Sequence, residues 1–304
     1  MLKFDLGFGR RLSRLLSVLH QAGGIDRDGA SYSYDNVGNR TAKTFLRQGD
    51  PDPVPVTASY SYDDIYQLTQ TVLDASLTET YSYDPVGNRL ASLGVPAYAY
   101  NNSNELTAKS DATYTYDANG NTLTKTASNG TTTYTWDFEN RLTSVALPNG
   151  KVQSYKYDPF GRRIQKITHN KTRAFAYDGD NMIEELKETG GWAARYTQGL
   201  GIDEPLALHL TAGTHYYEAV GLGSITSLTN AAGSVVNSYE YDSFGRLTSS
   251  DEAVTNVFRC TAREADLETG LYYYRARYYD SSTGRFLSED PHWIRAGIDY
   301  HRYV

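Results

Sequence analysis

A short aromatic motif recurs along most of this chain and restricts its fold more than any other feature. Its clearest copies read YSYDNVGNRT, Tyr32 to Thr41, and YSYDPVGNRL, Tyr81 to Leu90. After a longer first gap, the copies follow one another at roughly 20 residues, a period typical of repeat architectures. The last copy, YEYDSFGRLT, ends at Thr248. The second aromatic residues of the first seven copies are Tyr34, Tyr62, Tyr83, Tyr100, Tyr116, Trp136 and Tyr157.

Each copy of the motif predicts a β-hairpin. Two aromatic residues separated by one position point to the same face of a strand. The Asp that follows them ends the strand with an Asx turn, and the Gly supplies a residue with positive φ. One hairpin cannot bury its own rings, whereas stacked hairpins align them in a ladder. We therefore expect an all-β fold, a spiral of antiparallel hairpins. The turn glycines are Gly38, Gly87, Gly120, Gly161 and Gly245.

The composition favours a thin sheet and excludes several classes of partner. Tyr accounts for 27 of the 304 residues and Met for only 2. Tyrosine rings, which are apolar but carry a polar hydroxyl, therefore take the place of aliphatic side chains in the core. This predicts a single-layer sheet with both faces partly hydrated. A net charge of −7 argues against a nucleic-acid partner. The single cysteine, Cys260, excludes an internal disulfide, and no apolar run approaches the roughly 18 residues of a membrane span.

The chain divides into three predicted regions. Residues 1–30 form a lead-in, either a short amphipathic helix or a frayed segment, because leucines such as Leu15 and Leu19 recur at helical spacing. The apolar run there is too short and interrupted for a secretory signal. The repeat hairpins occupy residues 31–257, and a different segment fills residues 258–304.

The segment 258–304 has the highest density of aromatic and basic residues in the chain. Between Tyr272 and Tyr279 they alternate, which predicts one extended strand with Tyr272, Tyr274 and Tyr278 on a common face. The stretch from Asp280 to Gly284 is typical of a turn, after which a return strand begins at Arg285.

The residues from Glu268 to Pro291, ETGLYYYRARYYDSSTGRFLSEDP, resemble the Rhs repeat-associated core of bacterial Rhs and YD-repeat proteins. Family members usually have Pro where Ser281 stands, and they continue to a final Asp-Pro-x-Gly-Leu that would lie beyond Val304. The resemblance implies part of a hollow β-shell that encloses and plugs a C-terminal toxin in exported bacterial proteins. Its implied partners are that toxin cargo and the remaining shell segments.

The same resemblance singles out Asp290. The family core has an aspartyl self-cleaving activity, and Asp290 matches a position inside its motif. Two carboxylates held close together can divide the roles of acid and base. The second carboxylate and the cut site would lie beyond Val304, so we expect no enzyme activity from this chain alone. The alternative is that Asp290 only caps a turn before Pro291.

Three arginines of the core are candidate binding residues, for packing or for contact with a cargo. Packing would stack them on tyrosines and pair them with acidic neighbours. These arginines are Arg275, Arg277 and Arg285, and the acidic neighbours are Glu268, Asp280 and Glu289.

Other functions find less support in the sequence. The histidines lack metal-ligand spacing and no cofactor motif is complete, so neither a metal nor a cofactor is predicted. Trp136 and Trp192, with the many tyrosines, are suited to stacking on sugars, which leaves a cell-surface adhesion or carbohydrate-binding protein as the alternative. A gene remnant without a present role is a third possibility.

Overall fold

The computed structural model describes residues 2–8, 14–22, 25–46, 54–291 and 299–303. The chain separates into two compact units, residues 1–81 with 199–262 and residues 82–198 with 263–304. Within the described residues the regular structure is antiparallel β, apart from the single 3-10 turn η1 (Cys260–Ala262). The predicted all-β fold of repeated hairpins is confirmed.

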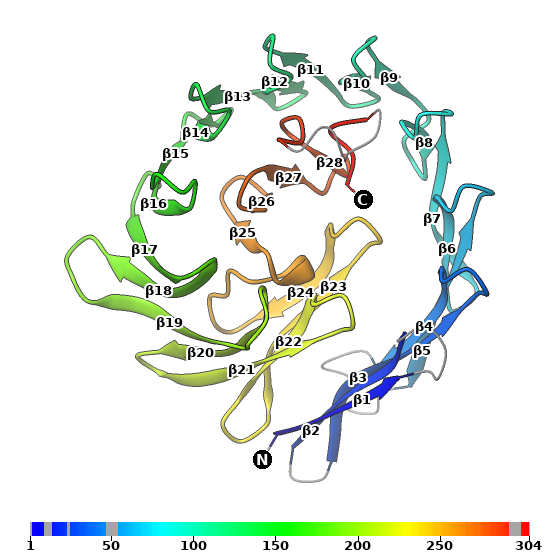
Figure 1. Ribbon diagram of the computed structural model, residues 1–304, viewed down its shortest axis with the longest axis vertical. Coiled ribbons are helices and arrows are strands. Elements are labelled where there is room, and N and C mark those ends of the chain that lie inside the picture. Colours follow the sequence, from blue (N-terminus) through cyan, green and yellow to red (C-terminus); the bar gives the residue numbers. More distant parts are fainter. Residues whose placement is uncertain (1, 9–13, 23–24, 47–53, 292–298, 304) are drawn as a thin grey trace. The chain divides into compact units, whose positions relative to one another are not determined.

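The first unit contains two runs of consecutive antiparallel strands (Figure 1). Val18, Ala30 and Tyr32 are buried together there, and Val220 from a turn of the second run packs against them. The first run consists of β1 (Leu2–Phe8), β2 (Leu15–Ala22), β3 (Ile25–Tyr34), β4 (Arg40–Leu46), β5 (Pro55–Tyr62), β6 (Leu68–Leu73) and β7 (Ser76–Tyr83). The second consists of β20 (Pro205–Leu210), β21 (Gly213–Ala219), β22 (Ile225–Asn230), β23 (Val235–Tyr241) and β24 (Leu247–Glu252).

The second unit contains a row of repeat strands and a small four-stranded sheet, β25–β28. The row consists of β9 (Tyr98–Tyr100), β10 (Leu106–Lys109), β11 (Ala112–Tyr116), β12 (Thr122–Ala127), β13 (Gly130–Trp136), β14 (Leu142–Ala146), β15 (Val152–Tyr157), β16 (Arg163–Ile167), β17 (Thr172–Asp178), β18 (Asn181–Lys187) and β19 (Trp192–Gln198). The unit also contains β8 (Arg89–Ser92), which belongs to a different sheet from β9. The small sheet consists of β25 (Glu264–Asp266), β26 (Leu271–Tyr273), β27 (Tyr278–Asp280) and β28 (Arg285–Phe286).

The repeat turns have the predicted chemistry. In the turn that starts at Asp84, Oδ1 accepts hydrogen bonds from the amides of Val86 and Asn88 at 3.0 and 2.8 Å. Gly87 has φ of 95° and donates to the Asp84 carbonyl. Positive φ is also found at Gly38, Gly120, Gly161 and Gly245, so the prediction for all five glycines is confirmed.

The lead-in is not helical where the structure describes it. Residues Leu15–Ala22 form β2, which pairs with β1 on one side and with β3 on the other. Pairing on both sides satisfies the backbone of β2, and β-branched Val18 packs into a sheet face. The weak helical spacing of the leucines loses to these long-range contacts. Leu12 lies outside the described residues.

The expected single-layer sheet is wrong for the second unit, where the repeats carry a second layer. Tyr134 and Tyr155 of the repeats are buried with Tyr273 and Tyr278 of the small sheet in one apolar cluster. Figure 1 shows β26 and β27, in orange, alongside the green repeat strands. Tyrosine rings are apolar along their bodies, so rings from a second sheet can cover those of the first while the hydroxyls find polar partners.

The stretch from Tyr272 to Tyr279 is a hairpin, not one extended strand. Tyr273 pairs with Tyr278 and Tyr272 with Tyr279 across β26 and β27. Arg275 takes φ of 62° in the connecting turn, and the Tyr274 amide donates to the Arg277 carbonyl. Alternating side chains suit one long strand and two short strands equally well, and the turn here has no glycine to reveal it. The return strand β28 after the turn Asp280–Gly284 is as predicted.

Candidate functional site

The candidate site is the surface on which residues 263–291 and 299–303, here called the core segment, lie against the repeats of the second unit. Two cation–carboxylate groups and one arginine that is hydrogen-bonded to two repeat turns join them, and we call these three groups the seats of the core segment. Each seat combines a repeat residue with a residue more than 100 positions away.

The first seat is built around Arg163, at the start of β16. Its guanidinium donates to Asp266 at 2.6 Å and to Glu264 at 2.7 Å, and its side chain is 2% exposed. The guanidinium carbon lies 4.4 Å from the ring centroid of Tyr273. The Arg163 amide also donates to the Tyr273 hydroxyl at 3.0 Å. Backbone and side chain of one repeat residue are thus both bound to the core segment.

Electrostatics fix the charges of the first seat. Burial opposes the charge on Arg163, but Asp266, Tyr278 and Glu264 raise its pKa well above the ordinary value. Burial likewise opposes the charge on Asp266, while Arg163 and then Lys166 lower the pKa of this carboxyl below its usual range. The Lys166 ammonium lies 3.1 Å from Asp266. Arginine is suited to this position because its planar group binds two carboxylates at once and stacks on a ring.

The second seat joins β12 to the turn that follows β27. The Lys125 ammonium donates to Asp280 at 2.9 Å. The Asp280 carboxylate also accepts from the Ser282 amide, which caps the turn. The amide and hydroxyl of Thr122 both donate to the Leu287 carbonyl at 2.8 Å. Burial opposes the Asp280 charge, but Lys125 and Ser282 lower the pKa of its carboxyl.

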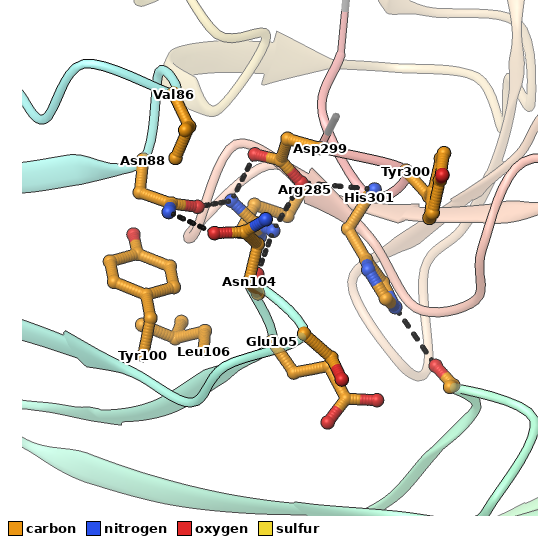
Figure 2. A network of polar contacts seen from close by, with 12 residues as sticks. Val86, Asn88, Tyr100, Asn104, Glu105, Leu106, Arg285, Asp299, Tyr300 and His301 are labelled. Carbon is orange, nitrogen blue, oxygen red and sulfur yellow. Dashed lines mark hydrogen bonds and ion pairs between the residues drawn. The ribbon is translucent and has the colours of Figure 1, made fainter. Parts of the chain in front are cut away.

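The third seat surrounds Arg285 of β28 (Figure 2). Its two terminal nitrogens bind the two oxygens of Asp299 at 3.0 and 2.8 Å. The same guanidinium donates to the Asn104 carbonyl at 2.7 Å and to the Asn88 side chain at 3.3 Å. Its carbon lies 5.2 Å from the Tyr100 ring centroid. Two consecutive repeat turns therefore bind one arginine of the core segment.

Asp290 lies in a partly buried ion pair. Its carboxylate is 3.0 Å from the Arg277 guanidinium, which lies over the Phe286 ring with its carbon 3.6 Å from the centroid. The Tyr300 carbonyl accepts from the Asp290 amide at 3.0 Å and from Arg277 at 3.2 Å. Burial lowers the pKa of Arg277, and the Asp290 charge opposes this.

Two of the three predicted arginines pair with carboxylates other than those expected. Arg277 pairs with Asp290 and stacks on a phenylalanine, whereas Arg285 pairs with Asp299 and stacks on a tyrosine. Arg275 lies in the hairpin turn. The acidic residues proposed as partners bind lysines instead, Glu268 with Lys166 and Asp280 with Lys125. The pairing was mispredicted because the core segment folds onto the repeats and not only onto itself.

The second aromatic residues of the repeats link successive hairpins. The Tyr116 hydroxyl donates to the Leu106 carbonyl at 2.9 Å, and the Trp136 indole donates to Thr122 at 2.8 Å. In each case the acceptor is the first residue of the return strand in the preceding hairpin. The other bonds of this kind are Tyr34 to Leu15, Tyr62 to Arg40, Tyr100 to Arg89 and Tyr157 to Leu142.

Sequence reasoning overlooked the residues that build the seats. Arg163, Asp266, Asp299 and His301 are all buried and polar, yet none was singled out. Arg163 and Asp266 stand among other charged residues, so nothing local distinguishes them. Their partners are distant in sequence, so no spacing rule could join them.

The fold and the seats define a repeat β-protein in which a terminal segment is bound to stacked YD hairpins. The teneurin YD-shell family matches residues 54–299. The chain is 35% identical over 92% of its length to the tRNA nuclease WapA of Bacillus subtilis. It is 26% identical over 90% of its length to the double-stranded DNA deaminase toxin A of Burkholderia cenocepacia. It spans 10% and 21% of these two relatives.

Solved structures share the fold. The chain superposes over its whole length on 18% of the TcdB2-TccC3 structure that lacks a hypervariable C-terminal region, with a TM-score of 0.81 and 20% identity. Against the Photorhabdus luminescens Tc holotoxin pore the TM-score is 0.80 over 99% of the chain and 17% of that structure, at 21% identity. The chain belongs to the teneurin YD-shell family. In the part of the chain that is described, no helix is long and apolar enough to cross a membrane.

Proposed function

We propose that this chain is the part of an exported bacterial toxin shell that encloses a toxin cargo following it in the polypeptide, with the core segment as the plug. The observation that carries the proposal is the set of three seats that bind the core segment to the repeats, two through ion pairs and the third through hydrogen bonds from Arg285. A plug has to resist displacement by the chain that continues from it. Buried pairs serve this purpose because separating one partner leaves an uncompensated charge.

The relatives support a shell that is shared among different cargoes. Two of them are named for different activities, a tRNA nuclease and a DNA deaminase, although this chain matches both over most of its length. The matched part is a small share of each relative. We infer that the activities are located elsewhere in those proteins and that the matched repeats supply the enclosure.

Within this function, Arg277 and Arg285 are assigned to the plug and not to the cargo. Both guanidiniums are bound to carboxylates of the core segment itself, Asp290 and Asp299. Asp290 is proposed as one carboxylate of a self-cleaving pair that separates shell from cargo. Arg277 binds its carboxylate, and the Tyr300 carbonyl accepts from its amide.

Protease protection of a reporter tests the enclosure. The polypeptide would contain this chain within a full row of repeats, with a protease-sensitive reporter protein placed after Val304. We expect the reporter to remain intact in proteinase K and to become digestible when Arg163→Met removes the first seat. Arg162→Met is the matched control, because the neighbouring Arg162 pairs with Asp158 inside its own turn. Equal digestion of the reporter in all three proteins would refute enclosure.

A further inference from the structure

The segment Asp299–Tyr303, here called the strap, lies against β28 and the turn at Gly120. The Phe286 amide donates to the His301 carbonyl at 2.9 Å, and the Asp290 amide donates to the Tyr300 carbonyl at 3.0 Å. The Tyr303 ring lies 4.9 Å from that of Tyr279 between centroids. The strap thus covers the aromatic residues of the core segment and holds the backbone of Asp290.

His301 is the most deeply buried contact of the strap with the repeats. The residue is 1% exposed. Figure 2 shows its ring on the side of the strap away from Asn88. Nε2 lies 2.8 Å from the Gly120 carbonyl, which can only accept, so Nε2 carries the hydrogen. In the neutral ring Nδ1 is therefore unprotonated, and it has no hydrogen-bond partner among the described residues. The ring meets Tyr116 edge to face, 5.8 Å between centroids.

The surroundings of His301 are unsuited to a second proton. Arg285 of β28 and Arg277 before β27 are both cations facing the ring, and Asp299 is the facing carboxylate. Both oxygens of Asp299 already bind Arg285, and one also accepts from the His301 amide. A proton on Nδ1 would therefore create a buried cation and a buried donor without a partner, both costly states.

We propose that His301 is an acid-sensitive latch, so that protonation of its free ring nitrogen detaches the strap from the Gly120 turn and from β28. The released strap would uncover the aromatic residues around Phe286 and free the backbone of Asp290. In neutral solution the latch is closed, because the imidazole is neutral and keeps its bond to the carbonyl.

The direction of the pH dependence follows from the protonation of His301 in the closed strap and in the released strap. Burial lowers the pKa of His301 to about 4, with Arg285 and Arg277 also lowering it, while the Gly120 carbonyl and Asp299 oppose them. In a released strap the imidazole returns to its ordinary pKa of about 6.5. The closed form is therefore fully stable above pH 6.5 and weakens as the pH falls toward 4.

Glu289 does not supply the same response. Glu289 packs beside Gly120, and burial and then Glu105 raise its pKa above the ordinary value. Because the pKa of Glu289 is raised in the closed form, its protonation stabilises the closed form as the pH falls. This effect is opposite to that of His301. Acid release is thus attributable to His301 and not to Glu289.

Hydrogen exchange at the Phe286 and Asp290 amides tests the latch in the complete chain. After correction for the intrinsic pH dependence of exchange, we expect their protection to fall roughly thirty-fold between pH 7.5 and pH 5. In His301→Gln the amide side chain can still donate to Gly120 but cannot be protonated in this range. Protection should then stay constant. His169→Gln, at an exposed position, is the matched control and should behave like the parent.

NMR titration of the His301 imidazole in the unsubstituted chain provides a second test, which does not depend on whether His301→Gln folds. We expect the His301 ring to gain its second proton only together with loss of protection at Phe286. Protonation near pH 6.5 with both amides still protected would overturn the latch. So would an equal loss of protection in His301→Gln, and so would constant protection of the parent chain down to pH 4.

Discussion

The Arg163 guanidinium lies 2.6 Å from a carboxylate oxygen of Asp266, a residue 103 positions later in the chain. Both side chains are 2% exposed. A pair this deeply buried offers little net stability compared with an apolar pair of the same volume, but removing one partner is costly. We therefore infer that the pair fixes the position of the core segment, since any other position would leave Asp266 without its cation.

Replacing Arg163 with Met should destabilise the second unit strongly. The substitution keeps most of the volume but leaves Glu264 and Asp266 without the guanidinium. We expect a loss of roughly 3 kcal/mol in the free energy of unfolding, the lower end for a broken buried pair, because Lys166 remains beside Asp266. Urea unfolding followed by circular dichroism measures it.

The neighbouring Arg162 provides the control for that measurement. Its ion pair with Asp158 is partly exposed, so Arg162→Met should cost about 1 kcal/mol or less. Adding Glu264→Gln to Arg163→Met should restore part of the loss, since one unpaired charge is removed. Equal losses for Arg162→Met and Arg163→Met would show that the seat has no special role.

A second prediction concerns two tyrosines of one repeat. The Tyr116 hydroxyl donates to the Leu106 carbonyl, whereas the buried Tyr114 hydroxyl has no partner among the described residues. Tyr116→Phe should therefore cost about 1 kcal/mol of unfolding free energy. Tyr114→Phe should be neutral or slightly stabilising. The two variants differ in one hydroxyl each, so a larger loss from Tyr114→Phe would contradict this account of the ladder.

The hairpins can be predicted from sequence because the contacts that define their turns join residues close together in the chain. Asp84 caps the amides two and four residues on, and Gly87 takes the left-handed conformation, within one short motif. Such contacts repeat with the motif. The lead-in was mispredicted for the converse reason, since β2 is a strand through pairing with its neighbours.

The seats were beyond sequence reasoning because each joins residues from opposite parts of the second unit. Arg285 was nominated, but its partners Asn88 and Asn104 belong to repeat turns nearly 200 positions away. Its carboxylate partner Asp299 is also farther from it in sequence than the expected partners Glu289 and Asp280, and only the fold of the core segment brings the pair together. The polar character of these side chains predicts that they need partners if they are buried. It does not predict which residues those partners are.

Alkaline solution should unfold the chain through its tyrosines. Burial raises the pKa of Tyr100 to about 12, with Arg285 and Arg89 opposing, and burial raises that of Tyr60 to about 12 as well. The pKa is higher in the folded chain than the ordinary value near 10. The stabilisation is thus complete below pH 10 and is lost as the pH rises toward 12. Tyrosinate absorbance should rise late and together with loss of β-sheet circular dichroism. A gradual rise near pH 10 with the fold intact would contradict this.

Self-cleavage of an extended chain tests the catalytic role proposed for Asp290 separately from the enclosure of a cargo. The purified chain should keep its mass of 33.9 kDa on prolonged incubation, because a single carboxylate cannot serve as acid and base at once. Fused to a family-type continuation that ends in Asp-Pro-x-Gly-Leu, it should release the C-terminal piece.

Asp290→Asn should lower the rate of that release by orders of magnitude while leaving the urea unfolding midpoint nearly unchanged. Asp180→Asn, at an exposed position between β17 and β18, is the control and should cleave at the parental rate. Cleavage of the Asp290→Asn fusion at the parental rate would leave Asp290 as a structural partner of Arg277 only.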